Sequence, residues 1–134
     1  HYCASGPLML QQILYVGLGG FIGSALRFLL GGLAQRLAPM GGFPVGTLAV
    51  NVLGCLAIGL LGGLADQRQA LDAGQRLFLM VGVLGGFTTF SSFALETLGL
   101  VQDGAILKAA LNCLLQMALG LSAAVLGYTA ARLI

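Results

Sequence analysis

The residues with the most distinctive chemistry form one short run inside a long apolar stretch. Two glycines precede four hydroxyl residues in the segment Gly85-Gly86-Phe87-Thr88-Thr89-Phe90-Ser91-Ser92-Phe93. Hydroxyl side chains compete for backbone hydrogen bonds and glycine weakens helices, so this run predicts a helix broken at residues 85–89. Broken backbone at membrane depth is tolerated where it is buried in protein or lines a polar cavity. The alternative is a continuous helix whose Thr and Ser side chains bond to the preceding turn.

Two side chains of this run and one from another apolar stretch have the chemistry to meet a small anion. Phe90 and Phe93 are three residues apart and therefore share a helix face. The edge of an aromatic ring is positive, so ring edges can face an anion. Asn51 lies in the middle of another apolar stretch, and its NH₂ group can donate a hydrogen bond. The alternatives are simple packing of the rings and an interhelical hydrogen bond of the amide.

Further polar residues lie at spacings that place them on common helix faces. Ser92 and Glu96 are four residues apart, and so are Asn112 and Gln116. Asn112 and Gln116 form a polar strip on an otherwise apolar stretch. This pattern favours a hydrated polar path along the helix over isolated interhelical hydrogen bonds. Arg27 is either a vestibule cation that gathers anions or an ordinary residue that extends its charge toward the membrane surface.

Residue types that catalysis requires are missing from the body of the chain. The one histidine is His1, the three cysteines are scattered, and there are no paired carboxylates or Walker loop. Disulfides, zinc and haem are therefore unsupported. The sequence predicts a protein that is not an enzyme.

Composition places these residues inside a membrane. Hydrophobic residues make up 58% of the 134 residues and charged residues only 7%, whereas soluble domains carry about 25% charged residues. Because a spanning helix needs about 20 apolar residues, we expect four helices, near 9–32, 45–65, 76–100 and 105–132. Pro44 is expected in the first turn of the second helix. Residues 9–134 would form a single domain, and residues 1–8 an N-terminal extension or a non-native remnant.

The basic residues are divided evenly between the two sides of such a bundle. With four spans, Arg68, Arg76 and Arg132 fall on one side, and Arg27, Arg36 and Lys108 on the other. Cytoplasmic loops normally hold an excess of Lys and Arg. An even distribution therefore favours a protein that inserts in both orientations, with a weakly biased single topology as the alternative.

Three segments together resemble the Fluc (CrcB) family of fluoride channels, and the resemblance extends from about Met9 to Ile134. They are Gly19–Phe28, Gly46–Gly54, and Gly85–Phe93 followed by Glu96. The resemblance implies an all-α membrane protein of four transmembrane helices, with the third helix broken, in the inner membrane of a prokaryotic cell. It also implies an antiparallel, dual-topology homodimer with two pores at its interface. The implied function is passive export of cytoplasmic fluoride, which confers fluoride resistance.

The same resemblance assigns roles to individual positions. The implied fluoride pathway comprises Asn51, Phe90, Phe93, Thr47, Ser91, Ser92, Glu96, Asn112 and Gln116, with Arg27 in a vestibule. The backbone carbonyls of Gly85 and Thr88, from both subunits, would hold a structural Na⁺ at the centre of the dimer. The implied partners are fluoride, a second copy of the chain and the lipid bilayer, without nucleic acid. Asn112 and Gln116 depart from the family, which often has Tyr and Ser along this track.

Two other functions fit a chain with four spans. A small multidrug-type exchanger also has dual topology, but it needs a membrane-buried carboxylate in its first helix, and residues 9–32 contain none. A structural subunit without transport activity would show no flux of any ion.

Overall fold

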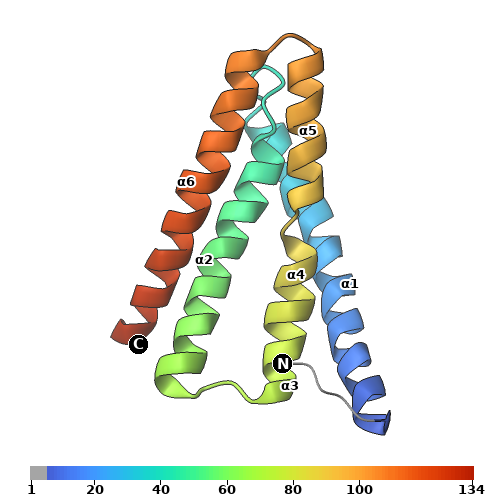
Figure 1. Ribbon diagram of the computed structural model, residues 1–134, viewed down its shortest axis with the longest axis vertical. Coiled ribbons are helices and arrows are strands. Elements are labelled where there is room, and N and C mark those ends of the chain that lie inside the picture. Colours follow the sequence, from blue (N-terminus) through green and yellow to red (C-terminus); the bar gives the residue numbers. More distant parts are fainter. Residues whose placement is uncertain (1–5) are drawn as a thin grey trace.

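The computed structural model describes residues 6–134, and all of its regular elements are helices. Four helical stretches are long and apolar enough to cross a membrane: Leu8–Leu37, Val45–Arg68, Ala73–Gln102 and Ile106–Leu133. Figure 1 shows them as one bundle in which the fourth stretch ends toward the same end of the bundle as the first begins, on the opposite side of the view. The prediction of an all-helical protein with four spans is confirmed.

The first helix is longer than the sequence predicted. The helix α1 spans Gly6–Leu37, so it continues five residues past the expected end at 32 and includes residues 6–8 of the expected extension. Residues 1–5 of that extension lie outside the described residues. Gln35 stabilises the added turn, because its amide donates to Phe43 O at 3.0 Å and accepts from Gly46 N at 3.0 Å.

The second helix, α2, spans Val45–Arg68. Pro44 therefore lies just before the helix and not in its first turn, where it was predicted. Pro44 precedes the helix as its N-cap, with φ −77° and ψ 69°. Its carbonyl accepts the first helical bond from Leu48 N at 3.3 Å. Proline has no N–H to leave unpaired at either position, so composition could not distinguish the two placements.

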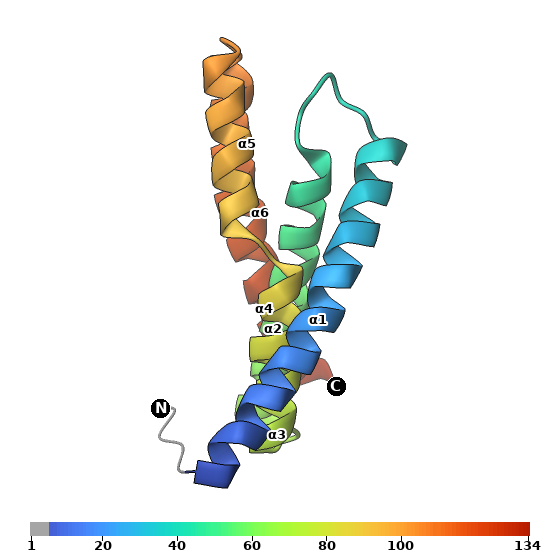
Figure 2. The same cartoon turned by 90° about the vertical axis from the view of Figure 1, so that its right-hand side faces the viewer.

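The third span is assembled from four helical pieces. These are α3 (Ala73–Arg76), the π-helix η1 (Leu77–Val83), α4 (Leu84–Phe87) and α5 (Phe90–Gln102). Between α4 and α5 the backbone is extended, with φ −85° and ψ 157° at Thr88 and φ −152° and ψ 115° at Thr89. Figure 2 shows α5 leaving the direction of α4 at this link. The fourth span is α6 (Ile106–Ala130), followed by η2 (Ala131–Leu133).

The extended segment is shorter than the interruption predicted over 85–89, because Gly85 and Gly86 are helical within α4. Gly86 packs directly on α1, where a Cβ at this position would lie 2.6 Å from Gly20 O. Close packing of small residues therefore keeps α4 helical, although glycine has a low intrinsic helix propensity.

Small residues also explain how α1 meets the third span. A Cβ at Gly23 would overlap Val83 O, and a Cβ at Gly82 would lie 2.9 Å from Gly19 Cα. Gly19 and Gly23 of α1 thus pack on the segment that contains Gly82 and Gly86. In both pairs two small residues are four positions apart, a spacing that lets helices approach closely. The third pair, Gly59/Gly63 in α2, faces α6. Glycines four residues apart favour such close contacts, but their spacing does not identify the partner helix.

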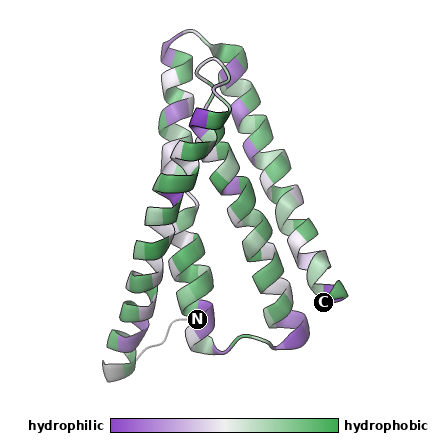
Figure 3. Cartoon of the chain, turned by 180° about the vertical axis from the view of Figure 1, so that it is seen from behind, coloured by the Kyte–Doolittle hydropathy of each residue, from purple (hydrophilic) through white to green (hydrophobic). Residues whose placement is uncertain are grey.

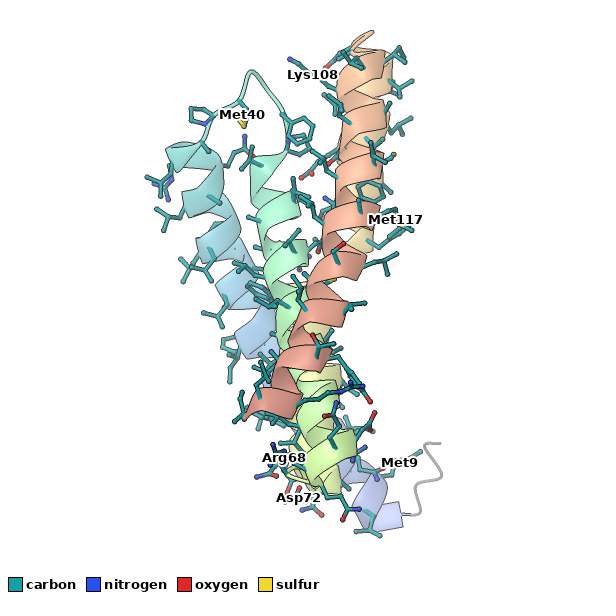
Figure 4. All side chains as sticks on the ribbon, turned by 90° about the vertical axis from the view of Figure 1, so that its left-hand side faces the viewer. Met9, Met40, Arg68, Asp72, Lys108 and Met117 are labelled. Atoms are coloured by element: carbon teal, nitrogen blue, oxygen red, sulfur yellow. The ribbon has the colours of Figure 1, made fainter. Side chains whose placement is uncertain are left out.

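Apolar side chains cover most of the molecular surface. Leu29 is 61% exposed, Leu107 74% and Phe90 76%. Figure 3 shows hydrophobic residues along the lengths of the helices and hydrophilic residues mainly toward their ends. In Figure 4, Arg68 and Asp72 lie at one end of the bundle and Lys108 at the other. A surface of this kind matches a lipid environment with water at both ends.

Candidate functional site

Asn51 and Thr89 are joined by two hydrogen bonds at the extended link of the third span. Asn51 Oδ1 accepts from the backbone N–H of Thr89 at 2.8 Å, and Asn51 Nδ2 donates to Thr89 O at 3.0 Å. In a continuous α-helix the Thr89 N–H would instead donate to Gly85 O, four residues earlier. The side chain of Asn51 therefore replaces a helical hydrogen bond and stabilises the extended conformation.

The hydroxyl of Thr89 plays a similar part at the start of α5. Its Oγ1 accepts from Ser92 N at 3.1 Å, the usual arrangement of a helix N-cap, and donates to Ser92 Oγ at 3.0 Å. In a continuous helix the Ser92 N–H would bond to Thr88 O. Two side-chain oxygens thus accept hydrogen bonds from the N–H groups of Thr89 and Ser92. In a continuous helix these N–H groups would donate to the carbonyls of Gly85 and Thr88.

These two carbonyls are the ones that the resemblance assigned to a structural Na⁺. Na⁺ is a hard cation, and hard cations prefer oxygen ligands such as backbone carbonyls. Gly85 and Thr88 line the same open cavity, and their helical donors are engaged elsewhere. The residues present therefore fit a carbonyl-bound cation. The hydroxyl of Thr88 donates to Leu84 O at 3.0 Å.

A cavity of about 300 Å³, here called the phenylalanine cavity, opens beside the link. It collects six of the predicted site residues: Asn51, Gly85, Thr88, Phe90, Phe93 and Gln116. The rings of Phe90 and Phe93 meet edge to face, with centroids 5.3 Å apart and planes at 63°. Two aromatic rings and the side-chain amides of Asn51 and Gln116 therefore border the same space, and these are groups that can face a small anion.

A second cavity of about 460 Å³, here called the glutamate cavity, lies among α1, α2 and α5. It collects four further predicted residues: Arg27, Thr47, Ser92 and Glu96. The Thr47 hydroxyl donates to Glu96 Oε1 at 2.7 Å. A basic and an acidic side chain thus border one polar space.

Thr89 lines both cavities, so the link lies between them. Thr89 lies in the segment predicted to be interrupted, but its sequence position alone indicated no role for it. Ser24 and Gln35 also line the glutamate cavity. No local signal identifies these two, because the pattern of α1 does not show which face meets α2.

Two predicted pathway residues line neither cavity. Ser91 is exposed, and its Oγ lies 3.3 Å from Thr89 Oγ1. Asn112 is fully buried and donates to Thr97 Oγ1 at 2.9 Å, and Thr97 in turn donates to Phe93 O at 2.7 Å. In this structure Asn112 therefore fastens α6 to α5.

Comparison with known proteins gives consistent matches over most of the chain. Residues 14–128 match the family model described as CrcB-like protein, Camphor Resistance (CrcB). A protein of Nitratidesulfovibrio vulgaris named fluoride-specific ion channel FluC is 46% identical over 125 residues, covering 93% of this chain and 100% of the relative.

Two further relatives bear the same name. The protein of Thermus thermophilus is 51% identical, covering 89% of this chain and 94% of its own length. The protein of Paracoccus denitrificans is 48% identical, covering 92% of this chain and 97% of its own length. All three are named as ion channels, which confirms the prediction that the chain is not an enzyme.

Proposed function

This chain belongs to the CrcB-like family and is a multi-pass membrane protein, and we propose that it forms a fluoride-selective ion channel. The observation that carries the proposal is the phenylalanine cavity, where two aromatic rings and two side-chain amides border one space in the middle of the spans. The relatives named as fluoride-specific channels support the same ion.

The cavity meets the two requirements of anion conduction. A bare anion in hydrocarbon costs tens of kcal/mol by Born solvation, so the pathway must replace its water shell. Neutral amides, hydroxyls and ring edges do this without a buried full positive charge, so the ion is also released easily. Arg27, half-buried in the glutamate cavity, would gather anions at an entrance.

The direction of flow follows from weak-acid chemistry. Hydrogen fluoride crosses a bilayer without help and ionises in the more alkaline cytoplasm, where the fluoride ion is trapped. A passive channel in the inner membrane of a prokaryotic cell would then let fluoride leave down its electrochemical gradient, and the cell would resist fluoride.

The functional unit in this proposal is an antiparallel homodimer with a pore along each side of the interface. The even division of basic residues between the two sides supports dual topology. The phenylalanine cavity is open, and Phe90 is 76% exposed at its border. A second copy would close this space and complete the pathway.

A structural Na⁺ would be held by the carbonyls of Gly85 and Thr88 from both subunits. The support for it is that Asn51 and Thr89 engage the amides that would otherwise bond to these carbonyls. A bound cation would supply fixed positive charge between the two pores.

The decisive measurement is fluoride efflux from liposomes that contain the purified protein, followed with a fluoride electrode. We expect rapid fluoride efflux and no comparable chloride efflux. Phe90→Ile keeps an apolar side chain but removes the ring edge, so its efflux should fall at least tenfold while the dimer persists. Equal fluoride and chloride fluxes would contradict selectivity, and absence of flux would favour a structural subunit.

The multidrug-type exchanger is not favoured. Its mechanism needs a carboxylate within the first span, and α1 contains no Asp or Glu over Gly6–Leu37. The three relatives are also named as fluoride channels.

A further inference from the structure

A groove of about 430 Å³, here called the tyrosine groove, opens where α1 meets the start of the third span. Its walls are Tyr15 and Leu18 of α1 and residues of the segment 72–79. In Figure 4, Asp72 lies at one end of the bundle, where the protein meets water. No residue of this groove lines the phenylalanine cavity or the glutamate cavity. The groove is therefore separate from the proposed ion pathway.

A carboxylate and an aromatic ring meet in this groove beside Gly74. A Cβ at Gly74 would lie 3.1 Å from Cε2 of Tyr15 and 3.4 Å from Oδ1 of Asp72, so the absence of a side chain leaves the ring and the carboxylate on one space. Of the described residues that line the groove, only Asp72 is charged. Its Oδ1 accepts from Gln75 N at 2.8 Å, and its Oδ2 has no hydrogen bond within residues 6–134. An acidic oxygen beside an aromatic ring suits an organic ammonium group.

Two hydrogen-bond donors lie at the same end of the groove. Gln75 Oε1 accepts from the backbone N–H of Asp72 at 3.0 Å, and because an N–H can only donate, the other atom of this amide must be Nε2. The Tyr15 hydroxyl accepts from Gln11 Nε2 at 2.9 Å, which leaves its own hydrogen to donate. Within the described part of the chain, neither Gln75 Nε2 nor the Tyr15 hydroxyl donates to another group. Donors for an anionic oxygen therefore lie next to a carboxylate for a cation.

The rest of the groove is apolar and lies deeper along the spans. Leu18 follows Tyr15 by three residues on the same face of α1, roughly 5 Å further along the helix. Phe78 and Leu79 follow Gln75 in the third span. The lining thus changes from polar at the end of the bundle to apolar toward its middle. This is the order in which a phospholipid places its headgroup and its acyl chains.

We propose that the tyrosine groove binds a phospholipid with a primary ammonium in its headgroup, as in phosphatidylethanolamine. The ammonium binds Asp72 Oδ2 beside the ring of Tyr15. The phosphate accepts from Gln75 Nε2 and the Tyr15 hydroxyl, and an acyl chain lies against Leu18 and Phe78. An anionic headgroup without an ammonium is repelled by the carboxylate. The inference concerns the surface that faces lipid and does not depend on which ion the protein conducts.

Native mass spectrometry tests the ammonium contact with equal amounts of phosphatidylethanolamine and phosphatidylglycerol of identical chains. We expect the parent to retain phosphatidylethanolamine at least fivefold more than phosphatidylglycerol. Asp72→Asn removes the charge but keeps the N-cap of α3, because Asn caps a helix as well as Asp does, so this preference should fall below twofold. Equal retention of the two lipids by the parent, or an unchanged preference in Asp72→Asn, would overturn the inference.

The matched control for the charge is Asp66→Asn. Asp66 is an exposed carboxylate that accepts from Tyr128 and lines none of the cavities described above. Its replacement should leave the preference of the parent unchanged. Loss of the preference in this variant as well would show a general effect of surface charge and refute a specific role of Asp72.

A second pair of variants tests the phosphate contact. Tyr15→Phe keeps the ring but removes the hydroxyl, so retention of both lipids should fall at least threefold, because both contain the phosphate. Tyr128→Phe is the matched control, since the Tyr128 hydroxyl donates to Asp66 Oδ2 outside the groove, and it should retain both lipids as the parent does. Equal retention in the two variants would refute the phosphate contact. A parent that retains neither lipid would refute the whole inference and indicate that a second copy covers the groove.

Discussion

At the scale of single residues, Asn51 shows how one amide resolves two problems. A polar side chain in a membrane span needs partners, and so does the backbone of an interrupted helix. Asn51 meets both needs, since its oxygen and nitrogen bond to the N–H and the C=O of Thr89. The sequence left the choice between ion donor and interhelical bond open. The structure shows an interhelical bond that also engages Gln116.

The bond between Thr47 and Glu96 gives a prediction at this scale. Thr47→Val keeps the shape of the side chain but removes the donor to Glu96 Oε1, while Glu96 Oε2 is already unpaired. We expect the variant to lose about 1 kcal/mol of stability, because a half-buried acceptor is left without a partner. Unfolding in detergent would measure it.

The control for this prediction is Thr129→Val. The Thr129 hydroxyl is exposed and donates only to carbonyls of its own helix, so its loss leaves no buried atom unpaired. Equal stability of the two variants would show that the Thr47–Glu96 bond contributes nothing beyond local effects.

At the scale of elements, the third span illustrates why helix propensity alone is insufficient. Glycines that favour interruption lie in helical α4, whereas the two threonines after them are extended. Gly86 packs against α1, which favours the helical conformation there, and side-chain bonds from Asn51 and Thr89 stabilise the extended residues. The interruption therefore depends on a neighbouring helix as well as on its own sequence.

The N-cap of α5 allows a test of this view. Thr89→Ala removes the oxygen that accepts from Ser92 N, and we expect a loss of about 1 kcal/mol in stability. Hydrogen exchange of the Ser92 amide should accelerate. Thr89→Ser retains the hydroxyl and should exchange at close to the parental rate. Parental exchange in both variants would show that the cap is dispensable.

The contact of α1 with the third span gives a second element-scale prediction. Gly23→Ala places a methyl group against Val83 O and Phe87 N, which are backbone atoms that cannot rotate away. We expect a loss of about 1–3 kcal/mol from overpacking, measured as the shift in an unfolding transition.

Gly17 in the same helix is the matched position. A Cβ there meets nothing within 4 Å, so Gly17→Ala should be neutral or stabilising by up to about 1 kcal/mol, since alanine is the better helix former. If both substitutions had the same effect, close packing at Gly23 would not govern stability.

At the scale of the whole molecule, the proposed homodimer can be tested through the orientation of its two copies. In an antiparallel pair the two-fold axis lies in the membrane plane, so only residues near mid-membrane approach their own copies. Thr88 lies at the link, whereas Val101 lies near the far end of α5. At about 1.5 Å per helical residue, these positions are well separated along the membrane normal.

Cysteine crosslinking distinguishes the two orientations. With the three native cysteines replaced, we expect Thr88→Cys to form a disulfide-linked dimer under oxidation and Val101→Cys to remain unlinked, because a disulfide needs Cα atoms within about 7 Å. Gel electrophoresis without reductant reads the result. A crosslink at Val101 with none at Thr88 would indicate parallel subunits and contradict dual topology.

Much of this molecule was determined by the sequence alone. Membrane residence and the order of the four spans follow from hydropathy and from local runs of residues, and these properties act over short distances along the chain. Helix ends were less predictable. The added turn of α1 depends on Gln35, whose bond to Gly46 crosses 11 residues of sequence.

Only the tertiary structure decided which polar groups pair and which remain free. The bonds from Asn51 to Thr89 and Gln116 join residues 38 and 65 positions apart. Such pairs form only when α2, α6 and the third span pack in one particular rotation, and no local pattern encodes that rotation. The division of the predicted site residues between two cavities and the position of Asn112 outside both are consequences of that packing.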